Sequence, residues 1–430
     1  MLCKNLLLPL LLALALSPAL QAAAEPTPDA TQPPPPTSWV DPDTGHRVIR
    51  LTREKMSASL YFNENGYTPD GKRMIYTTKD GIFLLDLATH ETSSVVQGDL
   101  RTICVGRKTP TVFYINNKEK ALYATGLDTG ETRKLADLPR RGRVSTINAD
   151  ETLGAGTYIE GDGKDYNEDA QKEPGAQEHS LDQPANKAKM MEERLAAKLP
   201  MVMFTIDLRT GETKPLLHST DWINHLLFSP TDPTLLMYCH EGPWHKVQRI
   251  WTIRTDGTQN KLIHQRTMAM EIAGHEFWSH DGKTIWYDLQ VPKGQVFYVA
   301  GYQVETGERT WYHLERNEWS IHFNVSADTT LFCGDGGNSG QVARAPDGQW
   351  INLFRPSLLH FDPEDGKDLI HPGLFTSERL VKMDKHQYKL EPNVSFTPDQ
   401  KMVVFRSNMF GDTYVFGVMV EKESPDKSTP

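Results

Sequence analysis

The sequence predicts an all-β fold, a seven-bladed β-propeller whose ring is closed by an N-terminal strand. Three observations predict it. A motif that ends in an Asp-containing turn recurs seven times, most copies are followed by further strand-like runs, and the last copy ends one strand short. A recurrence of roughly 40–50 residues is the spacing of propeller blades.

The recurring motif is a short β segment followed by its turn. Clear copies occupy residues 61–71 (YFNENGYTPDG), 223–232 (INHLLFSPTD), 274–282 (GHEFWSHDG), 321–328 (IHFNVSAD) and 392–399 (PNVSFTPD), and weaker copies occupy 101–108 and 144–150. Asp and Gly suit such turns because they tolerate left-handed backbone conformations and form local hydrogen bonds. The first strand of each blade should line the central channel.

The end of the chain indicates how the ring closes. The last copy supplies only three strands, and residues 46–52 (HRVIRLT) have no blade of their own. We predict that 46–52 adds the missing strand, because closure removes an open sheet edge. The propeller then spans residues 41–422, and residues 423–430 form a disordered tail.

One region interrupts the period within the third blade, at residues 159–200. It begins with a polar stretch and continues with MMEERLAAKL, a composition that favours a helix. Long insertions of this kind are either functional lids or loops without regular structure. The sequence leaves both interpretations open.

Residues 1–24 have the features of a signal peptide. Lys4 precedes an uncharged apolar run at 6–16, and small residues follow at Ala19 and 22–24. The apolar run is too short for a convincing membrane-spanning helix. Residues 25–40 follow as a Pro-rich tether. We therefore expect a periplasmic or secreted protein without membrane insertion.

Composition excludes some partners. The chain has 430 residues with 46 Lys and Arg against 56 Asp and Glu, a formal net charge of −10, and no basic run. Nucleic acid is therefore not an expected partner. An anionic substrate stays compatible, because local cations can outweigh the net charge.

A shared register brings three histidines to one mouth of the channel. The position six residues before the turn residue Asp281 is occupied, in successive blades, by Glu64, Thr102, Val144, His225, His275, His322 and Asn393. The inner strands begin at the same mouth, so these side chains should converge. The second strands return there with His240, Asp288, Asp335 and Arg406. Imidazole and carboxylate together suit Mn²⁺ or Zn²⁺, whereas carboxylates alone suit Ca²⁺.

At these residues the chain resembles the oligogalacturonate lyase family, most strongly over residues 202–420. The matching segments are IDLRTGE, LLMYCHEGPWHKVQRIWTIRTDG, GHEFWSHDG, the HFNVSAD and CGDG pair, and PNVSFTPD. The resemblance implies a seven-bladed propeller that cleaves short uronate oligosaccharides by β-elimination, as in pectin degradation. It also implies a manganese-type ion that holds the uronate carboxylate and a histidine that takes the C5 proton.

The resemblance assigns roles residue by residue. His240 matches the histidine of the family's CHEGP segment, Arg249 matches an arginine downstream, and His275 matches a family metal ligand. The other family ligands lie in a Gln-x-x-His-Pro-His-Pro run, where this chain has Tyr388, Glu391 and Asn393. Either these harder ligands favour Mn²⁺, Mg²⁺ or Ca²⁺, or the histidines act directly as acid and base without a metal.

The predicted site has three groups of residues. The catalytic candidates are His240, Arg249 and His225; the metal candidates are His275, Glu391, Asn393, His322 and His386; the substrate-binding candidates are Arg406, Asn63, Tyr388 and Asp335. The expected cofactor is a divalent metal, with Mn²⁺ favoured and Ca²⁺ as the alternative, and the expected partner is an acidic oligosaccharide. Two other functions stay open, a propeller glycoside hydrolase acting on a uronate-capped glycan and a TolB-like binding propeller without catalysis.

Overall fold

The structure, a computed structural model, describes residues 35–161, 184–337, 345–360 and 368–422. The predicted signal peptide, most of the tether, the first part of the insertion and the C-terminal tail lie outside the described residues. Within the described residues, no helix combines the length and the apolar character needed to cross a membrane.

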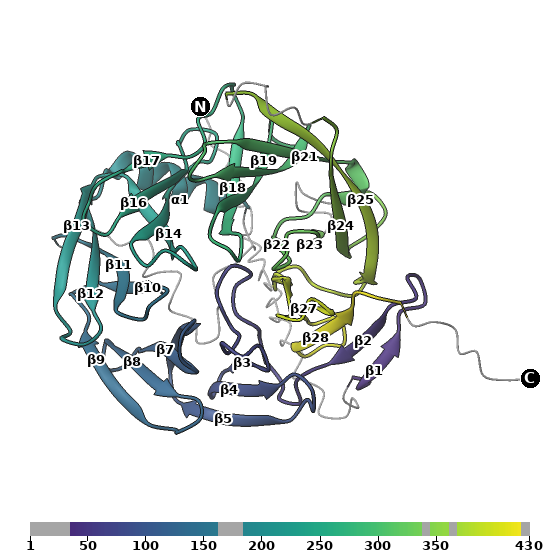
Figure 1. The fold of residues 1–430 in the computed structure, drawn as a ribbon, viewed down its shortest axis with the longest axis horizontal. Coiled ribbons are helices and arrows are strands. Elements are labelled where there is room, and N and C mark those ends of the chain that lie inside the picture. Colours follow the sequence, from purple (N-terminus) through teal and green to yellow (C-terminus); the bar gives the residue numbers. More distant parts are fainter. Residues whose placement is uncertain (1–34, 162–183, 338–344, 361–367, 423–430) are drawn as a thin grey trace, which may run out of the picture. The chain divides into compact units, whose positions relative to one another are not determined.

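Successive antiparallel meanders follow one another around a ring (Figure 1). Blade 1 contains β3 (Arg73–Thr78), β4 (Gly81–Asp86) and β5 (Thr92–Gln97). Blade 2 contains β6 (Leu100–Val105), β7 (Thr111–Asn116), β8 (Ala121–Gly126) and β9 (Thr132–Asp137). Blade 3 contains β10 (Arg143–Ile147), β11 (Leu153–Ile159), β12 (Met201–Asp207) and β13 (Thr213–Ser219). Blade 4 contains β14 (Trp222–Phe228), β15 (Leu235–Glu241), β16 (Ile250–Arg254) and β17 (Lys261–Leu262). The all-β propeller fold that the sequence predicts is confirmed.

The remaining blades are linked to one another. Blade 5 contains β18 (Ile272–Trp278), β19 (Thr284–Gln290), β20 (Phe297–Gln303) and β21 (Arg309–Leu314), and blade 6 contains β22 (Phe323–Val325), β23 (Phe332–Asp335), β24 (Trp350–Leu358) and β25 (Ile370–Lys382). β25 is long enough to pair with β24 along its length and, in parallel, with β21 of blade 5. One eight-stranded sheet therefore joins the two blades.

The N-terminal strand closes the ring. Blade 7 contains β26 (Ser395–Phe396), β27 (Met402–Ser407) and β28 (Tyr414–Met419), and β28 pairs with β2 (Arg47–Arg50). Val48 lies opposite Val418 and is fully buried. A further strand, β1 (Ser38–Val40), pairs with the outer side of β2. The predicted closing strand is thus present within residues 46–52, as β2.

The core lies between adjacent blades. The second strands read as nearly continuous apolar runs, as in β27, where all six residues are buried. Such runs are expected where a sheet is covered on both faces. Between blades 5 and 6, for example, Phe277, Trp286 and Phe332 pack together in one cluster. This packing fixes the strand ends that carry the site.

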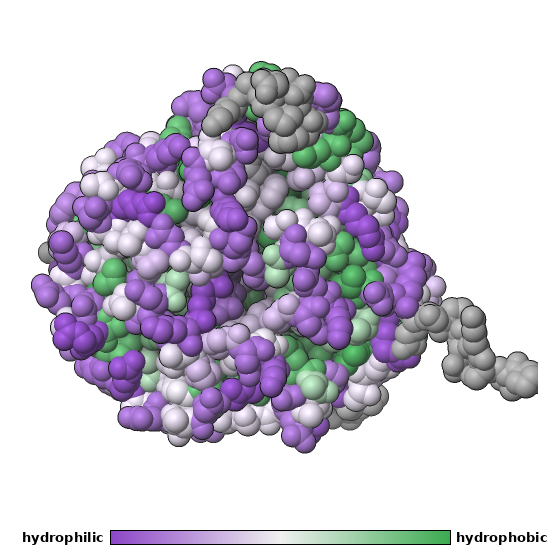
Figure 2. Space-filling view, in the orientation of Figure 1, coloured by the Kyte–Doolittle hydropathy of each residue, from purple (hydrophilic) through white to green (hydrophobic). Residues whose placement is uncertain are grey.

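Blade 1 departs from the predicted pattern. Its expected inner strand is reduced to two isolated bridges, Ala58 with Thr77 and Tyr67 with Met74. Between these bridges the chain leaves the sheet and rises into the middle of the ring (Figure 1). We call residues 58–67 the channel loop. Figure 2 shows a hollow near the centre of this face, bordered largely by hydrophilic side chains.

The described half of the insertion forms a helix, α1 (Pro184–Ala197), where the sequence predicts one. Arg194 on this helix stacks on Trp222 of blade 4, 4.3 Å from the ring centroid. Glu192 forms an ion pair of 2.7 Å with Lys246. The helix is therefore attached to blade 4, next to the loop that follows β15.

Candidate active site

Backbone bulges shape the inner strands of blades 4 and 5. The pairing register shifts between Asn224 and Leu227 in β14 and between Gly274 and Phe277 in β18. His225 and His275 lie in these bulges with left-handed φ values of 46° and 48°. A bulge redirects a side chain, and strained backbone of this kind is concentrated at functional sites. The two histidines are therefore placed by local backbone geometry that an ordinary strand lacks.

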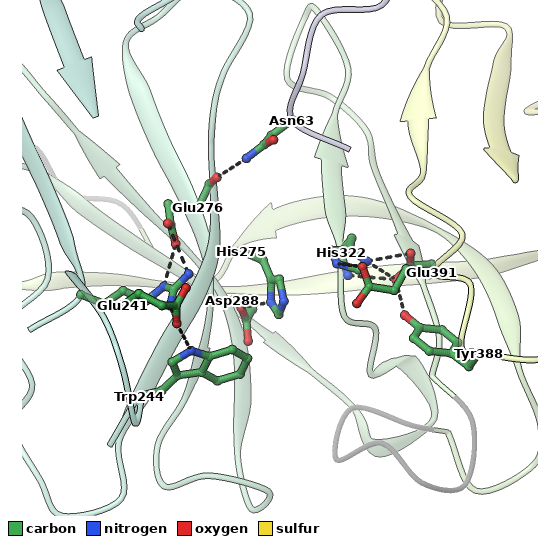
Figure 3. Close-up of polar contacts among 11 residues, drawn as sticks. Asn63, Glu241, Trp244, His275, Glu276, Asp288, His322, Tyr388 and Glu391 are labelled. Atoms are coloured by element: carbon green, nitrogen blue, oxygen red, sulfur yellow. Dashed lines mark hydrogen bonds and ion pairs between the residues drawn. The ribbon is translucent and has the colours of Figure 1, made fainter. Parts of the chain in front are cut away.

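Behind His225 lies a buried network of charges from blades 4 and 5. His225 Nε2 is 3.3 Å from Glu241 Oε2. Arg249 donates from Nη1 to Glu241 (2.9 Å) and from Nε to Glu276 (3.0 Å). Trp244 donates from Nε1 to Glu241 at 2.9 Å (Figure 3). Glu241, Glu276 and Arg249 are buried, so these three charges are sheltered from solvent.

The charges of this network favour a protonated His225. Burial raises the pKa of Glu241, but Arg249 and His225 outweigh it and hold that pKa well below its usual range. Burial lowers the pKa of His225, yet the neighbouring Glu241 carboxylate raises it overall. One guanidinium faces two carboxylates, so a proton on His225 balances the charge.

Two more histidines each have a buried carboxylate behind them. His275 Nδ1 is 2.8 Å from Asp288 Oδ1, and His322 Nδ1 is 2.9 Å from Asp335 Oδ2. The two imidazole rings lie 4.8 Å apart between centroids. A carboxylate on Nδ1 is the usual support of a metal-binding histidine that ligates through Nε2. Both rings thus have the environment of metal ligands.

A carboxylate completes this group. Glu391 Oε2 lies 3.5 Å from His322 Nε2 (Figure 3). His322 is fully buried, and its Nε2 has no hydrogen-bond partner among the described residues. A buried polar atom in that state is costly unless another group binds it. Two imidazoles and a carboxylate suit Mn²⁺ or a similar divalent ion, so His275, His322 and Glu391 fit a metal site.

Two predicted residues support this group from behind. Tyr388 donates its hydroxyl to Asp335 Oδ1 at 3.2 Å, and the Asn393 backbone N–H donates to Asp335 Oδ2 at 3.0 Å. The Asn393 side-chain amide faces Arg406. Asp335 itself holds His322. In this structure Tyr388, Asn393 and Asp335 therefore position a ligand instead of facing the metal or the substrate.

Two other predicted residues are engaged elsewhere. His386 Nδ1 lies 2.9 Å from Ser407 Oγ, and its Nε2 lies 2.7 Å from the Leu390 carbonyl. Neither ring nitrogen is left for a metal, so the geometry does not fit His386 as a ligand. Arg406 is buried and donates to the carbonyls of Glu391 and Ser59. It braces the chain around Glu391.

His240 lies on the other face of blade 4. Its ring contacts Tyr238 and Trp251, with centroids 5.6 and 5.0 Å away. Asp221 Oδ2 is 3.7 Å from its Nδ1. Neighbouring residues of a strand point to opposite faces, so Glu241 faces His225 whereas His240 faces blade 3. Burial lowers the pKa of His240, and Asp221 only partly opposes this.

A second set of potential ligands lies close together. One ligand atom from each of His225, Cys239 and Glu241 falls within 4.8 Å of the others. Arg249 already bonds Glu241, and burial raises the pKa of the Cys239 thiol well above its usual value. A metal here would have to displace a guanidinium and deprotonate that thiol. We therefore favour the His275, His322 and Glu391 group.

Sequence reasoning missed several residues of the site. Glu241 and Glu276 each directly follow a predicted histidine, in CHEGP and HEFW, and that adjacency was an available signal. The sequence of the channel loop contains no comparable signal. Asn63, predicted to bind substrate, instead donates from Nδ2 to the Glu276 carbonyl at 3.0 Å and anchors this loop.

Comparisons with known proteins point to one family. A sequence profile described as oligogalacturonate lyase matches residues 36–424. The oligogalacturonate lyase of Dickeya dadantii is 26% identical over 384 residues, covering 87% of this chain and 93% of that protein. The oligogalacturonide lyase of Pectobacterium atrosepticum is 27% identical with the same coverage.

Solved structures share the fold. A structure of oligogalacturonate lyase in complex with manganese is 23% identical, with a TM-score of 0.70 over 90% of this chain and 96% of that chain. An oligogalacturonate lyase from Vibrio parahaemolyticus is 21% identical, also with a TM-score of 0.70 and the same coverage.

Proposed function

Because the chain belongs to the oligogalacturonate lyase family, we propose that it cleaves uronate-containing oligosaccharides by β-elimination, with oligogalacturonate as the first substrate to test. The observation that carries the proposal is the grouping of His225, His275 and His322 at one mouth, each backed by a carboxylate. A binding propeller has no need of three such pairs.

His225 is our candidate for the residue that takes the C5 proton. Its side chain is 28% exposed against 16% for His240, and it shares a face with the other two histidines. Glu241 orients the ring, and a neutral imidazole is a suitable base for this proton. Arg249 is engaged by two carboxylates, so its role is to position Glu241 and not to clamp the substrate.

His275, His322 and Glu391 would hold a divalent ion. When bound, that ion would neutralise the uronate carboxylate and so stabilise the charge that develops when C5 loses its proton. Asp288 and Asp335 fix the two imidazoles in the orientation that binding requires. Manganese is favoured because one imidazole position of the family's ligand run is a carboxylate here.

The test is to incubate the purified protein with oligogalacturonates and other oligouronides and to follow the ultraviolet absorbance of the C4–C5 unsaturated product. A rise in absorbance that EDTA removes and Mn²⁺ restores is the expected result. Cleavage without unsaturation would instead identify a hydrolase. A folded protein that cleaves none of these glycans would leave a binding propeller as the better account.

A further inference from the structure

The channel loop is held in the middle of the ring by three other blades. Asn65 donates to the backbone of β6 (2.8 Å), Asn63 donates to the Glu276 carbonyl (3.0 Å), and the Phe62 carbonyl accepts from Asn324 (3.2 Å). The Phe62 side chain is only 2% exposed. The loop is therefore a fixed part of the site.

Tyr61 of this loop lies between two parts of the site. Its ring makes an edge contact with His322, with centroids 5.4 Å apart, and lies 6.4 Å from His225. The adjacent Phe62 packs on His322 at 4.9 Å.

β-Elimination requires a group that faces the departing oxygen. Negative charge develops on that oxygen as the C4–O bond breaks, and a hydrogen-bond donor placed there stabilises it. Arg249 and Trp244 already donate to Glu241, and Arg249 also donates to Glu276. A tyrosine hydroxyl is a suitable neutral donor beside the base.

We propose that the Tyr61 hydroxyl donates a hydrogen bond to the glycosidic oxygen that leaves C4, an inference that rests on the proposed function. The C5–H bond breaks and its proton passes to His225, while a double bond forms between C4 and C5. The C4–O bond breaks with its electron pair on oxygen. That oxygen then takes a proton from water and becomes a hydroxyl of the released sugar.

Tyr61→Phe tests this role because it keeps the ring contacts and removes only the hydroxyl. We expect kcat on an oligogalacturonate to fall about 100-fold, the effect of losing one such donor, with KM little changed. On a uronide whose C4 substituent is a nitrophenol, the loss should shrink to a few-fold, because a nitrophenolate leaves without help. Manganese binding, measured by calorimetry, should equal that of the parent.

Tyr67→Phe is the matched control. Tyr67 ends the same loop, and its hydroxyl lies 3.2 Å from the Ser395 hydroxyl. It should behave as the parent on both substrates. An equal loss on both substrates, weaker manganese binding, or full activity of Tyr61→Phe would each overturn the proposal. If the parent itself forms no unsaturated product, the proposed function fails and this role fails with it.

Discussion

The three histidines at the mouth differ in what lies behind them, and this difference assigns their tasks. His275 and His322 each have a carboxylate on Nδ1, so Nε2 is the atom each presents. His225 instead directs Nε2 to Glu241 and is the most exposed of the three. The first two rings suit a metal and the third suits proton transfer.

Replacing His225 separates it from His240 as the base. We expect His225→Ala to lower kcat by about 10²–10⁴-fold, the contribution of a positioned general base. His240→Ala should keep most of the activity, because its ring faces blade 3. Rates on oligogalacturonate would be compared for both folded variants. A collapse of activity in His240→Ala alone would return the base role to His240.

The pH dependence tests the pairing of His225 with Glu241. Burial lowers the pKa of His225, but Glu241 raises it overall, so the base form appears only above the usual value of about 6.5. The kcat/KM should therefore rise with pH through that raised pKa. Glu241→Gln removes the charge and should move the rise to lower pH. Asp221→Asn should leave it in place, unless His240 is the base.

The register of the repeats predicts the three histidines of the site. The other site residues depend on local side-chain contacts, which the repeats do not reveal. A common register places His225, His275 and His322 at one mouth, and this predicts them as site residues. The sequence also predicts His386 as a ligand, because it precedes the last inner strand, but Ser407 and the Leu390 carbonyl occupy both its ring nitrogens. Such contacts depend on how neighbouring turns fold, which the repeat pattern does not contain.

At the scale of the elements, the closing segment connects the first and last blades. Leu51 is 1% exposed and packs in a cluster with Met74 and Tyr76 of blade 1 and Val404 and Val415 of blade 7. Its backbone N–H donates to the Val415 carbonyl at 2.9 Å. The contacts that seal the ring are therefore apolar as well as hydrogen-bonded.

Leu51→Ala should destabilise the protein by about 2–5 kcal/mol, because it leaves a cavity at this junction. Val40→Ala is the matched control, since Val40 lies in β1 and is 44% exposed, and it should change stability by less than about 0.5 kcal/mol. Urea unfolding followed by fluorescence would measure both. Equal stabilities would show that the ring does not depend on this contact.

The elements that sequence reasoning missed are the ones that break the repeat. The bulges at His225 and His275 could not be predicted from the sequence, because left-handed backbone is uncommon for any residue other than glycine, even though histidine adopts it more often than most. The channel loop reads as an ordinary inner strand in the YFNENGYTPDG segment, yet Asn63 and Asn65 anchor it across the channel. Tertiary contacts decide such segments, whereas alternating patterns decide the strands of the blades.

At the scale of the whole molecule, the candidate metal group joins three blades. His275 comes from blade 5, His322 precedes the inner strand of blade 6, and Glu391 precedes that of blade 7. A metal bound by all three would act as a crosslink at the centre of the ring. Ligands that bind only the native state stabilise it by mass action.

Manganese should therefore raise the melting temperature as well as the activity. At a concentration 100 times the dissociation constant, the expected stabilisation is about 2.7 kcal/mol, and EDTA should remove it. His322→Ala and Glu391→Ala should each abolish the thermal shift, whereas His386→Ala should keep it, because both its ring nitrogens are already bonded. Calorimetry with Mn²⁺ would measure the affinities directly. A thermal shift that survives in His322→Ala but disappears in His386→Ala would show that the metal binds at His386 instead. If manganese leaves the melting temperature of the parent unchanged, no metal binds at this site and the histidines act without one.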